Sequence, residues 1–221
     1  MSTINGKVCV VNGVAVDKVF SNGRQVYGRN LLADSGFESG NVPSVTWGPS
    51  AIGAITVSSG GENFPQSFGK YMLKIESNDA STVLDQFILY PLANAILIKS
   101  GETWTYSYYY ASAGAATGPA SDYLLSGGNS NPIWGLSMGH GNRITTGGQT
   151  TWHRFTVTFT ATADITVTHI RFGFVKKSTN HGWICIDNIK LEQNPVATPW
   201  TPAPEDVLKG DVTTPNNLVA K

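Results

Sequence analysis

Hydrophobic and polar residues alternate with a period of two along much of the chain, which is the pattern of strands with one buried face. Residues 103–111 place four aromatic residues on one face, namely Trp104, Tyr106, Tyr108 and Tyr110. The opposite face holds Thr105, Ser107 and Tyr109. Residues 153–160 alternate Phe and Val with threonine in the same way. This pattern predicts strands with one dry and one wet face, as in an antiparallel sandwich.

Turn residues separate a series of such segments between residues 30 and 194. The predicted strands are residues 54–58, 70–76, 82–89, 103–111, 133–138, 153–160, 166–175 and 183–191. No segment sustains the i, i+3, i+4, i+7 apolar spacing of an amphipathic helix. We therefore predict an all-β main domain over residues 30–194, built as a jelly roll or a similar β-sandwich.

The first 29 residues carry two Asn-Gly pairs between β-rich runs, Asn12-Gly13 and Asn22-Gly23. Asn-Gly favours the type I′ turn of a tight hairpin, because both central positions need a positive φ. Residues 1–29 are thus predicted to form a short N-terminal β-hairpin extension. So short a segment cannot build its own core. We expect it to pack on the main domain, on another subunit or on a partner.

Residues 195–221 have a different composition. The proline-rich part is predicted to be extended and packed along the domain, with Trp200 pinning it there. The tail after Glu205 is expected to be mobile, or to link the domain to another segment. Residues 112–130, a glycine- and serine-rich stretch within the main domain, are expected to form a long exposed loop.

The charge balance narrows the classes of partner. The 221 residues include 15 Lys and Arg and 15 Asp and Glu, so the formal net charge is zero. This balance argues against nucleic acid, which binds to a basic face, and against a polybasic membrane anchor. No apolar run approaches the roughly 20 residues of a membrane span. The N-terminus also lacks the pattern of a signal peptide, so we expect synthesis in a cytoplasm.

Motifs for catalysis are absent from the sequence. The four histidines show no HExxH spacing, and there is neither a GxSxG motif nor a P-loop. No motif pairs two acids as glycoside hydrolysis requires. Cys9 and Cys185 lie in apolar runs and are interpreted as buried free thiols, although a bridge between them stays open. We predict that the protein is not an enzyme.

Three stretches resemble a known family. NLLADSGFESG at residues 30–40, GKYMLKIES at 69–77 and WICIDNIKLEQ at 183–193 are similar to the anchor strands of jelly-roll carbohydrate-binding modules, the kind attached to xylanases and cellulases. The flanking stretches DKVFSNGRQVYGRNLL and KLEQNPVATPWTPAPED resemble those that bracket such modules in tail and baseplate proteins of phages infecting Gram-positive bacteria. The middle of the domain matches in pattern only.

The resemblance implies a non-catalytic virion protein of a phage tail or baseplate, made in the bacterial host cytoplasm. It would help adsorption by binding a host cell-wall polysaccharide. Residues 1–29 would dock to other tail or baseplate proteins, or would form the self-association surface of a homo-oligomer. The alternative is a purely structural tail or baseplate decoration subunit that binds only protein. A weaker alternative is a module from a bacterial glycoside hydrolase.

The resemblance also implies a structural calcium ion, Ca²⁺, that ties the first strand to the last. Glu38 and Asp187 would supply carboxylates, and a backbone carbonyl near Lys70 would help complete an all-oxygen shell. The alternative is that both acids are simply hydrogen-bonded at strand ends.

A saccharide site needs an exposed aromatic ring with polar groups around it. Most aromatic residues, including Trp104 and Trp152, are expected in the core. The candidates for ligand contact lie beside loops and polar neighbours: Trp47, Tyr123, Trp134, His140, Arg143 and Trp183. Which saccharide they would bind is not encoded in any motif.

Overall fold

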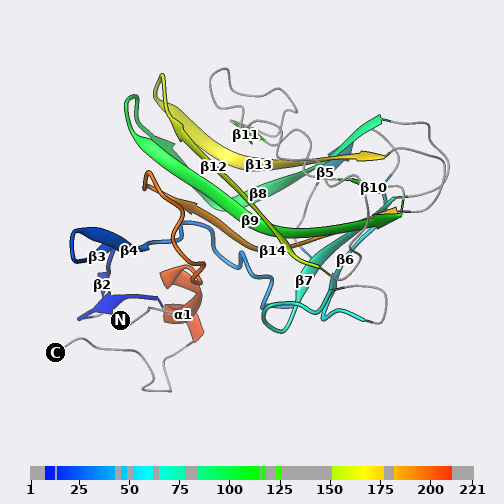
Figure 1. Cartoon of the computed structure of the whole chain (residues 1–221), viewed down its shortest axis with the longest axis horizontal. Helices are drawn as coiled ribbons and strands as arrows, with labels where there is room; N and C mark the ends of the chain where they lie inside the picture. Colours follow the sequence, from blue (N-terminus) through cyan, green and yellow to red (C-terminus); the bar gives the residue numbers. More distant parts are fainter. Residues whose placement is uncertain are drawn as a thin grey trace.

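The computed structural model describes residues 8–12, 14–42, 46–48, 52–61, 65–77, 84–114, 116–117, 123–125, 151–176 and 182–210. Two antiparallel sheets form its body (Figure 1). The first sheet has the order β12 (His153–Thr160), β9 (Thr103–Gly114), β14 (Gly182–Glu192), β7 (Met72–Ser77) and β6 (Ile52–Ser58). The second has β10 (Ala116–Thr117), β13 (Ile165–Lys176), β8 (Leu84–Ile98) and β5 (Thr46–Gly48), with β11 (Tyr123–Leu125) also paired to β13.

One hydrophobic cluster fills the space between the sheets. The aromatic face of β9 points into it, as the alternation predicted: Tyr106 is fully buried and Tyr108 is 1% exposed. The ring of Tyr108 meets that of Phe172 on β13 edge-on, with centroids 5.3 Å apart, which joins the two sheets. The fold is thus the predicted all-β jelly-roll sandwich.

The predicted wet face of β9 is wrong in one respect. Thr105 and Ser107 are each 1% exposed, because residues 194–203, here called the C-terminal strap, lie across them. Thr105 Oγ1 donates to the carbonyl of Asn194 at 2.6 Å. Arg154 bridges Ser107 Oγ at 3.3 Å and the carbonyl of Thr198 at 2.8 Å. Side chains of the sheet therefore hold the backbone of the strap, a contact that alternation alone does not reveal.

A buried ion pair anchors the strap. Lys190 and Glu192 on β14 are fully buried, with their charged groups 3.6 Å apart. Lys190 Nζ donates to Thr198 Oγ1 at 2.7 Å and to the carbonyl of Pro199 at 2.8 Å. Glu192 accepts from the backbone nitrogen of Thr198 at 2.8 Å. Both charges are hydrogen-bonded, which is the condition under which buried charges are tolerated.

The pair has a consequence for pH dependence. Burial lowers the pKa of Lys190 from 10.5 to about 8, although the charge of Glu192 opposes this. Between pH 8 and about 10 the folded protein therefore releases a proton that the unfolded chain keeps, so stability rises with pH. Over this pH range, we expect the free energy of unfolding of the wild type to rise by at most about 1.4 kcal/mol per pH unit relative to that of the double variant Lys190→Met/Glu192→Leu. Urea unfolding of both proteins at several pH values measures this, and a flat difference contradicts it.

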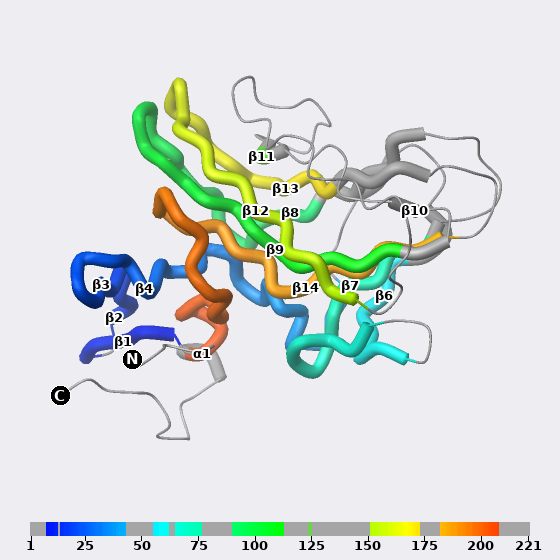
Figure 2. Tube along the Cα trace, viewed as in Figure 1, coloured from blue at the N-terminus to red at the C-terminus, as the bar shows by residue number. Residues whose placement is uncertain are grey.

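The N-terminal extension forms two hairpins, as predicted. β1 (Val10–Val11) pairs with β2 (Val14–Ala15), and β3 (Lys18–Ser21) pairs with β4 (Arg24–Gly28). Asn12 and Asn22 take positive φ values of 50° and 51° at the turns. The hairpins and helix α1 (Pro204–Gly210) lie at the same end of the molecule (Figure 2).

The C-terminal segment departs from expectation just after Glu205, because residues 206–210, the start of the predicted tail, belong to the short helix α1, whereas residues 211–221 lie outside the described residues. Arg29 forms an ion pair with Glu205, and Asp206 accepts from the backbone nitrogen of Asp34 at 2.9 Å. Trp200 pins the strap, as predicted, through a bond from its indole nitrogen to the carbonyl of Ile189 at 3.1 Å. Arg29 and Asp34 thus hold the start of helix α1 against the domain.

Both cysteines are free; Cys185 is buried, whereas Cys9 is only half-buried. Strand β8 continues past the predicted end at residue 89 through Pro91, which is paired with His169 at the start of an irregularity in β8 and lies beyond the part of β8 paired with β5. None of the helices among the described residues is long and apolar enough to cross a membrane.

Candidate functional site

Two carboxylates bind one tight loop, residues 65–71, from different sides. Glu38 accepts hydrogen bonds from the backbone nitrogen of Lys70 at 3.0 and 2.9 Å. Asp187 accepts from the backbone nitrogen of Phe68 at 2.9 Å. A side chain at Gly69 would meet the Glu38 carboxylate, so any larger residue there would make that carboxylate shift. The three residues predicted to hold calcium are therefore neighbours in the fold.

A β-bulge positions Asp187. The pairing of β14 with β9 shifts between Asp187 and Lys190, and Asn188 takes a φ of 52°. The bulge lets the backbone nitrogen of Asn188 donate to Asp187 Oδ1 at 2.7 Å. Asp187 is fully buried. Burial raises its pKa to about 7, against the backbone hydrogen bonds and with a further contribution from the charge of Glu38.

The ligands that these residues offer are oxygen atoms, the type of ligand that calcium prefers. Both side chains offer carboxylate oxygens, and calcium completes its shell with carbonyl oxygens. A divalent cation would also compensate the buried charge of Asp187 beside Glu38. Among the described residues, no group of three or more Asp, Glu, His or Cys forms a metal cluster. Carbonyl oxygens must therefore supply much of any shell here.

A groove opens beside this corner on the outer face of the first sheet. It has a volume of about 460 Å³ and lies between the 65–71 loop and the strap. We call it the Phe68 groove; its lining is Glu38, Phe68, Gly69, Tyr109, Arg154, Asn188, Pro199 and Trp200. Phe68 is 49% exposed, the only large exposed apolar side chain described in this lining.

Neighbouring aromatic rings support the exposed ring of Phe68 in the groove. The ring of Phe68 packs on Tyr109 and on Trp152, with centroids 4.5 and 5.1 Å away. Trp152 is itself tied to the loop by a bond from its indole nitrogen to the carbonyl of Gln66 at 2.8 Å. The guanidinium of Arg154 lies over the Tyr109 ring at 5.7 Å. The groove thus combines a fixed apolar ring with polar groups at its rim, the composition of a saccharide site.

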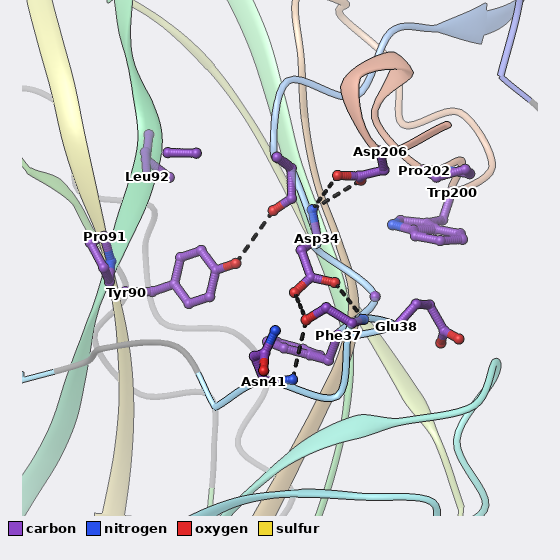
Figure 3. A pocket seen from close by; sticks show the side chains of 14 residues that line it. Asp34, Phe37, Glu38, Asn41, Tyr90, Pro91, Leu92, Trp200, Pro202 and Asp206 are labelled. Atoms are coloured by element: carbon purple, nitrogen blue, oxygen red, sulfur yellow. Dashed lines mark hydrogen bonds between the residues drawn. The ribbon is translucent and has the colours of Figure 1, made fainter. Parts of the chain in front are cut away.

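A larger cavity of about 690 Å³ shares the lining residues Glu38 and Trp200 with the groove, and Figure 3 shows its lining. We call it the Asp34 cavity; residues 33–41, 90–93 and 200–206 contribute its lining. The carboxylate of Asp34 is fixed by Ser39, whose backbone nitrogen donates at 3.0 Å. The hydroxyl of Tyr90 points to the carbonyl of Ala33 at 3.5 Å.

The structure places only some of the predicted ligand residues. Trp47 on β5 pairs with Ile88 on β8. Ile88 pairs in turn with the core residue Phe172 on β13, so the three positions are in register across the second sheet. Tyr123 on β11 pairs with Arg171 on β13. Trp134, His140 and Arg143 lie outside the described residues.

Trp183 is not on the surface. It is 6% exposed and packs in a small cluster with Met72, Ala111 and Cys185. Its indole therefore presents almost no face to a ligand. The polar neighbours that suggested a binding role precede the strand in sequence, whereas Trp183 itself lies within β14.

Sequence reasoning missed the groove residues. Phe68 was not singled out, and Trp200 was interpreted only as a pin. A usable signal exists for two others: Tyr109 and Arg154 are the large residues on strand faces that otherwise carry Ser and Thr. A large planar group in a face of small hydroxyl side chains marks a place where the surface packs or binds something.

Comparisons with known proteins bear on the fold. No protein-family model and no curated protein matches the chain. An arabinose-bound family 51 α-L-arabinofuranosidase is similar over 74% of this chain and 26% of its own, with 13% identity and a TM-score of 0.54. A family 61 carbohydrate-binding module in complex with β-1,4-galactotriose covers 76% of this chain and 100% of its own, with 15% identity and a TM-score of 0.48.

A third similar structure is the enzymatically active domain of bacteriophage CBA120 tailspike protein 4. It covers 75% of this chain at 12% identity and a TM-score of 0.47, and the match spans 21% of the tailspike chain. This chain therefore spans about a quarter or less of the arabinofuranosidase and the tailspike. At 13% identity and a TM-score above 0.5, the likeness to the arabinofuranosidase shows a shared fold alone.

Proposed function

We propose that the protein is a non-catalytic carbohydrate-binding protein of a phage tail or baseplate, which helps adsorption to a host cell-wall saccharide. The observation that carries the binding role is the Phe68 groove. The half-exposed ring of Phe68 lines this groove together with the charged side chains of Arg154 and Glu38. The place in a virion, assembled in the host cytoplasm, rests on the resemblance of the flanking stretches.

Each part of the groove matches a part of a sugar. The ring of Phe68 offers the apolar surface on which the C–H face of a pyranose stacks. Arg154 donates hydrogen bonds, Glu38 accepts them, and Asn188 offers both, as the hydroxyl rim of a sugar requires. Phe68 is already packed on Tyr109, so little side-chain entropy is lost on binding.

One observation favours the second candidate, a purely structural subunit that binds only protein. The hairpins of the N-terminal extension expose Val14 at 68%, Phe20 at 60% and Val11 at 40%. Exposed apolar side chains grouped on a small extension are typical of an assembly surface. The two roles are compatible if the extension docks to the virion, or to another copy, and the groove binds sugar.

Binding of the fluorescently labelled protein to Gram-positive cells and to their extracted wall polysaccharide tests the proposal. We expect saturable binding that multimeric display strengthens, since one site alone is weak. Trp47→Ala and Trp134→Ala test the positions favoured by the sequence. Absence of binding by every multimeric form would support the structural subunit instead.

We also propose a structural calcium ion at Glu38, Asp187 and the 65–71 loop. Calcium that binds only the folded protein at 100 times its dissociation constant adds about 2.7 kcal/mol of stability. We expect the melting temperature to rise with calcium, and Asp187→Asn to remove that rise. The control is Asp164→Asn, which changes an exposed carboxylate paired with Lys99. A wild-type melting temperature that is the same with and without calcium contradicts the proposal.

A further inference from the structure

The Phe68 groove and the Asp34 cavity have two lining residues in common. Glu38 and Trp200 line both, although the remaining walls come from different elements. The groove is bounded by the 65–71 loop and β9, whereas the cavity is bounded by residues 33–41 and by Tyr90–Ala93 of β8. Trp200 therefore stands at the border between two hollows of the same surface.

Trp200 is fixed in this position. Its indole nitrogen donates to the carbonyl of Ile189 at 3.1 Å and approaches Ser35 Oγ at 3.4 Å. Gly36 lies against the ring, because a Cβ there would be only 3.0 Å from Trp200 Cζ2. A ring held on its edge and its nitrogen is preorganised, so a ligand that contacts it does not have to order it.

The chemistry of the Asp34 cavity selects a kind of ligand. Tyr90, Pro91 and Leu92 give it an apolar wall, and Figure 3 shows Asp34 and Asn41 facing the same space. Asp34, Glu38 and Asp206 line it, so it offers acceptors for hydroxyl donors and repels anions. Neutral hydroxyl-rich chains fit this lining, whereas phosphate-bearing or uronic acid chains do not.

We propose that the Asp34 cavity is a second subsite that continues the Phe68 groove across Trp200, so that one neutral polysaccharide chain occupies both. This inference rests on the proposed function of the Phe68 groove. A ligand of this kind is recognised along its length and not at its tip alone.

The test measures affinity against chain length. The probe is a size-fractionated set of neutral fragments from extracted Gram-positive wall polysaccharide, titrated calorimetrically into the wild-type protein. We expect the affinity to rise by about tenfold or more, equivalent to about 1.4 kcal/mol, once a fragment is long enough to pass Trp200. Fragments that carry phosphate or carboxylate are expected to bind more weakly than neutral ones of equal length.

Two matched variants locate the second subsite. Ala93→Trp places a bulky group on an exposed residue that lines the Asp34 cavity, and Ala95→Trp makes the same change two residues along the same strand, outside that lining. We expect Ala93→Trp to abolish the gain with length while short fragments bind as before, and Ala95→Trp to behave as the wild type. Length-independent affinity, or a gain that survives Ala93→Trp, overturns the second subsite alone. Absence of binding by every fragment overturns the proposed function as well.

Discussion

Replacing Glu192 with alanine is expected to lower the free energy of unfolding by about 3–5 kcal/mol, the typical cost of removing one partner of a buried ion pair. The change leaves the ammonium of Lys190 fully buried without its carboxylate. It also removes the acceptor for the backbone nitrogen of Thr198. The strap should therefore loosen along with the loss of stability. The midpoint of urea unfolding measures the effect.

The control is an ion pair in a different environment. Lys99 and Asp164 approach to 2.8 Å, but both side chains are 54% exposed. Removing Asp164 is expected to change the free energy of unfolding little, since water screens exposed pairs. If Glu192→Ala fails to fold, the double variant Lys190→Met/Glu192→Leu should recover most of the loss, because it leaves no unpaired charge. Equal small effects at both pairs contradict this account of the strap.

Phe68→Ala is expected to weaken binding of wall polysaccharide by about 10- to 100-fold, which corresponds to about 1.4–2.8 kcal/mol. Truncation removes the exposed ring from the groove lining, and aromatic contacts commonly dominate a binding site. The backbone nitrogen that donates to Asp187 is retained, so the loop keeps its anchor. Calorimetric titration measures the change, with circular dichroism to confirm the fold.

Phe20→Ala is the matched control. Phe20 is 60% exposed and lies on β3 of the N-terminal extension, away from the groove lining. We expect its loss to leave affinity for a soluble polysaccharide unchanged. Equal losses in both variants would indicate a general hydrophobic effect, and full affinity in Phe68→Ala would place the saccharide elsewhere.

The strands were predictable where one face is dry. Phe155 and Tyr106 alternate with small polar residues, and that pattern alone places them in the core. Short strands such as β5 and β11 were missed, because three residues do not establish a period. The burial of Thr105 under the strap was missed for a different reason. A polar strand face has the same sequence pattern whether its hydroxyl groups bond to water or to the backbone of another segment.

The site was only partly predictable. The resemblance singled out Glu38 and Asp187, and both carboxylates bind the 65–71 loop, while the calcium ion itself stays a prediction. The aromatic candidates were chosen by their nearness to loops, and that rule favoured Trp183, which is buried. Phe68 was missed because its exposure depends on contacts with Tyr109 and Trp152, which are distant in sequence.

The most direct test of the central claim follows the indole signals of the protein by NMR while wall polysaccharide fragments are added. The six tryptophans give six indole N–H signals, which single Trp→Phe variants assign. A saccharide in the Phe68 groove contacts the border formed by Trp200, so the account predicts that the Trp200 signal shifts saturably while that of the buried Trp183 stays in place. Shifts at other tryptophans with Trp200 unchanged would contradict the site, and no shift at any signal would contradict binding in the Phe68 groove.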